Sequence, residues 1–537
     1  MYWNLFTPFN IVLIALWACS AFLSYADYCY IWQLKEYRLD RMRDFFSTKQ
    51  GRTYWFNFAF LIRALCAVGI ALWPIDTIGL LKTFILWILI VDLGYHLYCY
   101  WRKTARYPRP TPKALLLLAT AFALEAVLAL WQRDWSLVFF LMLGRFFIMS
   151  GVVFVWNQVT RRVKDLIIYQ ATRKIARLPN LKVIGITGSY GKSSVKEFTS
   201  QILQSKYKVI KTPGNINTDI GIAQFILHTD FTEADIFVCE MGAYQIGEIK
   251  KICNIVKPRV GILTSIIEQH LSLFGSIKNI QTAKYELLRS IPENGLVITN
   301  ADNIYCTELL GELTCKNQAL FGDEPENNPT YLIEEVESRA DGVTWKLNTE
   351  NVNHEFFSPL RGPHQPSNVV PGIIVGCFLK LSFDEIKAVV TTLEPGPNAL
   401  SVYQYQSATI IDDTYNSNPR GFKAALDILS SFSSKLRRVV ITRGMLELAD
   451  RSAEYHARIG EEIAFCADEL VLISPDSADD FMKGVNALKN KYPLEVRMIF
   501  NPNELLKYVQ AKAKEPTVIL MENRLPALVK NEIKKPV

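Results

Sequence analysis

Hydrophobic positions follow two different patterns along the 537 residues. Up to about Trp156, apolar residues form long runs, each close to the roughly 20 residues that a helix needs to cross a bilayer. Tryptophan and tyrosine gather near the ends of these runs, as they do at membrane interfaces. The pattern therefore predicts a bundle of about five transmembrane helices, at Pro8–Ala26, Trp55–Trp73, Ile78–Tyr100, Ala114–Trp131 and Trp135–Trp156.

Beyond Trp156 the apolar runs shorten, and after a basic helical connector strand-like and helix-like stretches alternate, as in α/β domains. We expect strands at Leu181–Thr187, Ile236–Cys239, Val260–Thr264, Gly295–Thr299, Thr409–Asp412, Arg438–Thr442 and Leu470–Ser474, and helices at Pro419–Phe432 and Ala453–Cys466. The chain is therefore predicted to be multi-domain, with a helical transmembrane domain at 1–160 and two α/β domains at 161–394 and 395–537.

Basic residues between the apolar runs predict the orientation of the bundle. Six lysines and arginines lie in the first loop and five in the third, whereas the second loop carries only Asp76 and the fourth only Arg133 and Asp134. Because cytoplasmic loops are enriched in lysine and arginine, the N-terminus is expected outside and the α/β domains in the cytoplasm. The segment Gln33–Phe46 has a basic, amphipathic pattern and is expected to lie on the inner leaflet.

Composition adds little beyond this picture. The net charge of +7 is modest and is explained by the loops, so nucleic acid is not an expected partner. The ten cysteines form no CxxC pair and no metal-ligand spacing, which favours reduced thiols in a reducing compartment. Further apolar runs follow the first one, and no basic segment precedes it, so a cleaved signal peptide is not expected.

Six ionisable residues fall inside the apolar runs, where a charge is costly unless it faces protein. They are Arg63, Lys82, Asp92, His96, Glu125 and Arg145. One interpretation is a site for an anionic lipid or lipid-linked phosphate that uses Arg63 and Arg145. The other is pairing between helices, such as Glu125 with Arg145, and it is the one we favour.

A glycine-rich segment follows the strand predicted at Leu181–Thr187 and opens a helical pattern that runs to Gln204. It contains Gly185, Gly188, Ser189, Gly191, Lys192, Ser193 and Ser194. Strand, glycine loop and helix is the arrangement that cradles phosphates on backbone N–H groups. Lys192 is expected to reach the β- and γ-phosphates of a nucleotide, and the Ser193 hydroxyl to ligate Mg²⁺. A glycine-rich helix start without a ligand is the alternative.

The segment from Gly185 to Ser194 resembles the T-G-[ST]-x-G-K-[ST] loop of the Mur ligase family, and further motifs follow in that family's order. They are Thr212–Gly221 with Asn215 and Asn217, Glu240–Gly242, His270–Gly275, Ala283–Glu286, Thr299–Asp302, Gly362–His364 with Asn368, and Asp413–Pro419. The D-x-Y-N-x-N-P motif and Met445–Leu448 resemble the branch that adds D-alanyl-D-alanine. The resemblance covers roughly residues 180–530.

The resemblance implies an α/β P-loop central domain, a Rossmann-like C-terminal domain and a role for each motif. Glu240 at a strand end would share Mg²⁺ with Ser193, and His270 would ligate a second Mg²⁺ ion. Lys284 matches a lysine that becomes carbamylated and binds metal. Alone, Glu240 could cap a turn, His270 could be structural, and Lys284 could be a solvated helix residue.

The remaining motifs are implied to contact nucleotide and substrate. Asn215 and Asn217 belong to the substrate loop. Asn300 and Asp302 resemble contacts to adenine and ribose, although alone they would be assigned to an Asx turn. His364 and Asn368 would bridge to the final domain, or else be a loop residue and a helix cap. The acid Asp413, with Tyr415, Asn416 and Asn418, would line the substrate cleft; a generic turn is the alternative.

The chain departs from the family at three places. The apolar half occupies the position at which a soluble ligase of this branch has a domain that binds the uridine nucleotide. Pro395-Gly396-Pro397-Asn398 lacks an expected arginine, and Met521-Glu522-Asn523 replaces a late K-G-S. These differences concern the acceptor and the final domain, and they leave the ATP site unchanged.

We therefore expect an ATP-dependent ligase that forms an amide through an acyl phosphate. By resemblance it adds D-alanyl-D-alanine or a similar amine to a peptidoglycan-type precursor, and the apolar half favours a lipid-linked or membrane-proximal acceptor. A second hypothesis is a ligase for another amide, such as a poly-amino-acid or a modified surface polymer. A third is an ATP-driven transporter or scaffold with a degenerate ligase domain, for which no second P-loop is present.

Overall fold

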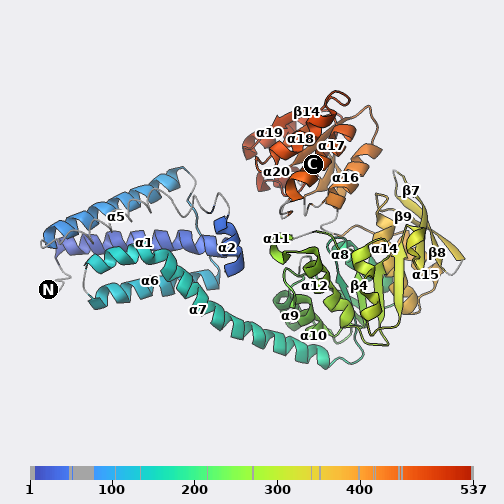
Figure 1. Cartoon of the computed structure of the whole chain (residues 1–537), viewed down its shortest axis with the longest axis horizontal. Coiled ribbons are helices and arrows are strands. Elements are labelled where there is room, and N and C mark those ends of the chain that lie inside the picture. Colours follow the sequence, from blue (N-terminus) through green and yellow to red (C-terminus); the bar gives the residue numbers. More distant parts are fainter. Residues whose placement is uncertain are drawn as a thin grey trace. The chain divides into compact units, whose positions relative to one another are not determined.

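The computed structural model describes residues 7–47, 51, 78–102, 105–132, 135–214, 216–268, 271–339, 341–349, 352–396, 400–414, 417, 419–445, 448 and 451–533. The chain divides into two compact units, Met1–Asp165 and Leu166–Val537. Each unit is described by itself, and Figure 1 shows their helices and strands.

The first unit is made of long apolar helices that pack around a shared core. Its described helices are α1 (Pro8–Leu34), α2 (Leu39–Ser47), α5 (Ile78–Trp101), α6 (Pro112–Gln132) and the first part of α7 (Trp135–Ala176). Apart from the short α2, these four are long and apolar enough to cross a membrane. Four of the predicted spans thus correspond to helices, and the predicted span Trp55–Trp73 lies outside the described residues.

Many large apolar side chains in this unit face outward. Trp87, Leu97, Trp131 and Phe147 are each more than 60% exposed. A soluble protein rarely leaves such a surface uncovered. In α2, by contrast, Met42 and Phe45 pack into the core of the bundle. The position of this segment on the inner leaflet stays a prediction.

A buried polar network joins four helices of the first unit. Arg145 (α7) donates through Nη2 to Glu125 Oε1 (α6) at 3.0 Å, and both side chains are fully buried. Trp17 (α1) donates to the same oxygen at 2.8 Å. Arg145 also donates to Ser20 Oγ, which donates to Asp92 on α5 at 2.5 Å. The structure thus has the pairing of Glu125 with Arg145 that the sequence favoured.

The helix α7 is longer than predicted. Its apolar pattern ends near Trp156, but the helix runs on to Ala176 and enters the second unit. There Ala171 and Ile175 are buried in the core, and Lys174 Nζ donates to the carbonyl oxygens of Leu227 and Thr229 at 3.2 and 2.8 Å. The predicted basic connector is therefore the second half of this helix.

The central part of the second unit is a nine-stranded sheet with helices on both faces. The strand order is β2-β3-β1-β4-β5-β6-β7-β8-β9. Neighbours from β2 to β7 are parallel, and β7, β8 and β9 form an antiparallel meander. The helices α8, α14 and α15 share one core with the sheet, and α7, α9, α10 and α12 share the other.

Four of these strands, β1, β3, β4 and β5, agree with predicted strands to within one residue, and the other five were not predicted. The strands are β1 (Lys182–Thr187), β2 (Val209–Lys211), β3 (Ile236–Glu240), β4 (Val260–Leu263), β5 (Leu296–Asn300), β6 (Gln318–Gly322), β7 (Tyr331–Ser338), β8 (Val343–Thr349) and β9 (Val352–Ser358). The helices are α8 (Lys192–Gln204), α9 (Asp219–His228), α10 (Glu248–Val256), α11 (Leu271–Phe274), α12 (Ile277–Arg289), α13 (Ile304–Thr307), α14 (Gln365–Phe378) and α15 (Phe383–Val390).

The C-terminal part of the second unit is a six-stranded sheet of order β10-β11-β15-β12-β13-β14, parallel except for β10. One face packs on α16, α17 and α18, and the other on α19 and α20. The bounds are β10 (Ser401–Tyr405), β11 (Ala408–Asp413), α16 (Pro419–Ser431), β12 (Arg437–Thr442), α17 (Ser452–Cys466), β13 (Glu469–Leu472), α18 (Ala478–Leu488), β14 (Glu495–Met498), α19 (Pro502–Lys512), β15 (Thr517–Glu522) and α20 (Ala527–Ile533).

Candidate active site

The loop between β1 and α8 has a backbone that only glycine adopts without strain. Gly188 has a φ of +153°, and a Cβ atom there would lie 1.9 Å from Thr264 Oγ1. Gly191 has a φ of +80° and precedes the first residue of α8. The first turn of a helix has backbone N–H groups without partners inside the helix, so this loop offers donors to an anion.

Hydrogen bonds to the segment after β4 hold the loop in place. The Ser189 N–H donates to the Ser265 carbonyl at 2.7 Å, and the Ile267 N–H donates to Ser189 Oγ at 3.0 Å. Thr264 Oγ1 donates to the carbonyl of Tyr190 at 2.5 Å. The strands β1 and β4 are neighbours in the sheet, so their parallel pairing places the two loops together.

Two lysines meet at the loop. Lys192 Nζ donates to the Gly188 and Ser189 carbonyls at 2.7 and 3.2 Å, and Lys284 Nζ (α12) donates to the Gly188 carbonyl at 2.9 Å. Burial lowers the pKa of Lys192 and lowers that of Lys284 well below its usual value; the charge of Lys192 adds to the second effect. Two lysine amines therefore lie together at the phosphate loop, and their burial favours the neutral form of each.

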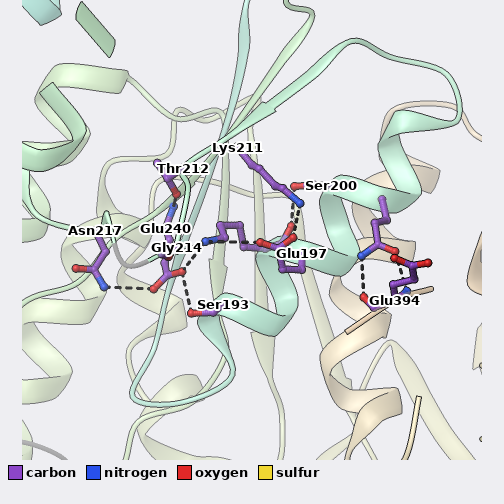
Figure 2. Close-up of polar contacts among 11 residues, drawn as sticks. Ser193, Glu197, Ser200, Lys211, Thr212, Gly214, Asn217, Glu240 and Glu394 are labelled. Atoms are coloured by element: carbon purple, nitrogen blue, oxygen red, sulfur yellow. Dashed lines mark hydrogen bonds and ion pairs between the residues drawn. The ribbon is translucent and has the colours of Figure 1, made fainter. Parts of the chain in front are cut away.

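A carboxylate and a hydroxyl meet beside this loop, as Figure 2 shows. Glu240 ends β3, the neighbour of β1, and its Oε2 accepts from Ser193 Oγ at 2.9 Å. Its Oε1 accepts from Asn217 Nδ2 at 3.2 Å. Carboxylate and hydroxyl oxygens suit Mg²⁺, which commonly takes only one or two protein carboxylates and completes its shell with phosphates and water. Ser193 and Glu240 therefore fit the implied ion.

Sequence reasoning missed Lys196, one turn further along α8. Its side chain is 1% exposed, and Nζ donates to Glu240 Oε2 at 3.1 Å and to the Gly214 carbonyl at 3.2 Å. The only available signal was its position four residues after Lys192, on the same side of the helix.

Several of the residues predicted from the sequence lie together around the phosphate loop, and others lie outside the described residues. Lys192, Ser193, Glu240, Lys284 and Asn217 come together through the contacts above. Ser194 lies in the first turn of α8 and has intermediate exposure. Five further candidates, Asn215, His270, Tyr415, Asn416 and Asn418, lie outside the described residues.

Of the pair predicted to contact adenine and ribose, Asn300 is engaged in a local turn and Asp302 in contacts with a loop further along the chain. Asn300 Oδ1 accepts the Asp302 N–H at 2.8 Å, which is the Asx-turn contact. The Asp302 carboxylate accepts the Asp323 N–H at 2.8 Å and Asn327 Nδ2 at 2.9 Å. These contacts tie the end of β5 to the loop after β6. Nucleotide contacts of these side chains remain a prediction.

The second predicted pair lies at the start of α14. His364 precedes this helix, and burial lowers its pKa to about 4. Its Nδ1 is buried and has no hydrogen-bond partner among the described residues. A Cβ on Gly191 would lie 3.0 Å from Asn368 Oδ1, so the Asn368 amide borders the phosphate loop.

Asp413 ends β11 next to Glu522, the last residue of β15. The two are direct partners in the parallel ladder. Burial raises the pKa of Asp413 to about 6, and burial together with Asp413 raises that of Glu522 well above its usual value. Ser417 Oγ donates to Glu522 Oε1 at 2.6 Å. The helices α16 and α17, which follow β11 and β12, cover one face of the sheet, whereas α20, which follows β15, covers the other. Asp413 and Glu522 thus lie at the carboxyl ends of two strands whose following helices cover opposite faces, which is where α/β sheets bind ligands.

Comparison with known proteins agrees with this geometry. Residues 186–376 match the Mur ligase middle domain and residues 400–522 the Mur ligase glutamate ligase domain, together more than half of the chain. A UDP-N-acetylmuramoyl-tripeptide–D-alanyl-D-alanine ligase of Escherichia coli K12 is 30% identical over 281 residues, 52% of this chain and 61% of that protein. The Bacillus subtilis ligase of the same name is 27% identical over 368 residues, 66% and 76% of the two chains.

Solved structures show the same fold. MurF from Acinetobacter baumannii is similar with a TM-score of 0.60 and 24% identity, covering 69% of this chain and 79% of that one. MurF from Thermotoga maritima, solved in complex with ADP, has a TM-score of 0.58 and 24% identity, covering 69% and 82%. The chain spans less than two thirds of the length of the Escherichia coli relative. In the domains formed by its second unit, the chain belongs to the Mur ligase family.

Proposed function

We propose that this chain is an ATP-dependent acid–amine ligase of cell-wall synthesis that works at the cytoplasmic face of a membrane. The observation that carries the proposal is the meeting of Lys192, Ser193, Glu240 and Lys284 around the loop after β1. The relatives named above are ligases that join D-alanyl-D-alanine to a UDP-muramoyl-tripeptide, and this chain carries the family's motifs in order.

The residues have distinct tasks in nucleotide binding. Ser193 and Glu240 would hold Mg²⁺, which neutralises charge on the transferred phosphate. Lys192, whose ammonium now donates to loop carbonyls, would turn to the phosphates. Lys284 would hold a second ion with His270 after carbamylation. Its depressed pKa favours the neutral amine, the form that reacts with CO₂.

The reaction follows from the need to activate a carboxylate. The acceptor's carboxylate oxygen attacks the γ-phosphorus of ATP, so that ADP leaves and an acyl phosphate forms. The amine then attacks the acyl carbon, phosphate leaves, and the amine loses one proton. Asp413 in the C-terminal sheet is our candidate for orienting the amine, and Asn217 for orienting the acceptor beside Glu240.

The first unit is proposed to span the cytoplasmic membrane, with the N-terminus outside and the ligase domains inside. Its outward-facing apolar side chains and its four helices of sufficient length support this location. Because α7 leads directly from this unit into the ligase core, a lipid-linked or membrane-proximal acceptor is the substrate class that fits.

The test is product formation by the full chain in detergent with ATP, Mg²⁺, D-alanyl-D-alanine and either lipid-linked or soluble UDP-linked precursor. We expect amide product by mass spectrometry with the lipid-linked form, and none with Lys192→Ala. Product from the soluble precursor alone would contradict the lipid-linked acceptor, and no product from any pair of substrates would contradict the ligase.

A second candidate is a Mur-type ligase that makes a different amide. It is favoured by the buried Glu522 beside Asp413, where the resemblance led us to expect K-G-S rather than an acid. Release of phosphate from ATP across a panel of amines distinguishes the two. Preference for an amine other than D-alanyl-D-alanine would support the second.

A further inference from the structure

The buried lysine of α8, Lys196, has no place in the reaction described above. Its Nζ donates to Glu240 Oε2 and to the Gly214 carbonyl, and it lies 3.9 Å from Glu197 Oε1. The Lys196 side chain is 1% exposed, and a buried ammonium normally has polar or charged partners such as these. Its ammonium is thus committed to Glu240 and the substrate loop, unlike that of Lys192.

Lys196 is one member of a row of alternating charges. The row runs from Glu240 through Lys196 and Glu197 to Lys211, which forms an ion pair with Glu197. Figure 2 shows Glu240 at one end of this row and Glu197 with Lys211 at the other. The two carboxylates of this row balance the charge of its two ammonium groups. The carboxylate at the candidate metal site therefore already has a counter-cation from the protein.

This arrangement has a consequence for a free metal ion. No cluster of three or more His, Cys, Asp or Glu side chains able to hold a metal exists in the described part of the chain. A divalent ion at Glu240 and Ser193 would have one carboxylate, and its Oε2 already accepts from Lys196 Nζ at 3.1 Å. An ion bound to this carboxylate would therefore lie near the ammonium, and like charges repel at close range in a buried site. Nucleotide phosphates would bring the negative charge that is missing.

We propose that Lys196 is a positioning residue that serves as the resident counter-cation of Glu240. It orients the carboxylate in the absence of metal and weakens binding of a free divalent ion, so that the ion enters with the nucleotide's phosphates. This inference rests on the proposed function, because it assumes that the site takes Mg²⁺ with ATP.

The test measures binding of Mn²⁺ alone to the full chain in detergent, by electron paramagnetic resonance at constant pH and without nucleotide. Lys196→Met and Lys196→Gln should bind the free ion at least about tenfold more tightly than the unsubstituted chain. Lys196→Arg, which keeps the charge, should not. Lys211→Met is the matched control, since Lys211 contacts Glu197 and not Glu240, and should change the affinity by less than about threefold.

A double variant locates the effect, and melting curves guard against misfolding. Adding Glu240→Gln to Lys196→Met removes both charges of the pair and should abolish the gained affinity. Melting curves identify any variant that fails to fold, and Lys196→Gln keeps a donor where Met leaves none. Unchanged or weaker Mn²⁺ binding in folded Lys196→Met and Lys196→Gln overturns the inference.

The outcome is separable from that of the proposed function, because the Mn²⁺ assay contains neither ATP nor a ligase substrate. Amide formation by the unsubstituted chain with no gain of Mn²⁺ affinity in the variants rejects only the role of Lys196. Gained affinity without amide product rejects only the ligase.

Discussion

At the scale of single residues, the phosphate loop depends on one glycine whose replacement has two costs. Gly188→Ala would place a methyl group against Thr264 Oγ1 and force alanine into a φ of +153°. We expect a loss of about 1–3 kcal/mol of stability and loss of ATP binding, measured as the ATP-induced rise in melting temperature. The matched control is Gly247→Ala, which has a φ of +95° but open space around its Cβ. An ATP response retained in Gly188→Ala would contradict this prediction.

The Asp413 carboxyl predicts a pH dependence of stability. Its pKa is raised from 3.8 to about 6, so its contribution to stability is complete below about pH 4 and is lost as pH rises through 6. Asp413→Asn removes this loss. From about pH 4 to pH 8 the variant should gain about 2–3 kcal/mol in stability relative to the unsubstituted chain. Melting temperatures at both pH values check it, and parallel pH trends of the two proteins would refute it.

The roles of individual site residues could be predicted where they depend on neighbouring residues in the sequence. Lys192, Ser193 and the loop glycines follow one another in the chain, so strand, loop and helix are enough to assign them. Lys196 differs because its partner Glu240 is 44 residues away, and only the pairing of β1 with β3 brings them together. Asp302 likewise uses its carboxylate on a loop about 20 residues further along, which no local pattern reveals.

At the scale of elements, the buried parallel strands β1, β3 and β4 were predicted well, because both faces are covered and their sequences are continuous apolar runs, whereas the parallel strands β2 and β6 were not predicted. The second half of α7 was located only as a separate connector, since its polar residues end the apolar pattern while the helix continues. The meander β7–β9 was not predicted. One side of its strands is partly exposed, so its alternating pattern is weak beside the apolar runs of the central strands.

The elements of the first unit are joined by a charge pair whose removal is costly. Glu125→Leu or Arg145→Met alone leaves a fully buried charge without its partner and should cost about 3–5 kcal/mol. The double variant removes both charges and should recover most of the loss. The melting temperature of the full chain in detergent is the measurement.

The exposed pair Lys208–Glu233 offers the contrasting control, because both side chains are more than 60% exposed. Lys208→Ala should leave the melting temperature nearly unchanged, since solvent screens exposed ion pairs. A double variant Glu125→Leu with Arg145→Met that is as unstable as the single variants would show that packing, and not charge pairing, explains the cost.

At the scale of the whole molecule, hydrophobicity alone predicts an apolar unit and a ligase unit, with a boundary at residue 160, where the long apolar pattern has ended. In the structure the two compact units divide at Asp165, within α7, and the last turns of this helix join the core of the ligase unit. A helix shared by two units cannot be divided by composition alone.

This boundary predicts how truncated chains behave. A chain that begins at Leu166 removes the exposed apolar helices yet keeps Ala171, Lys174 and Ile175 on the ligase core, so it should dissolve without detergent and bind ATP. A chain that begins at Pro179 loses the burial of Ile175 and the two hydrogen bonds of Lys174. It should be less stable by about 2–4 kcal/mol, measured by urea unfolding. Equal stability of the two chains would mean that α7 serves only as a tether, and a need for detergent by the longer chain would place part of the apolar surface within the ligase unit.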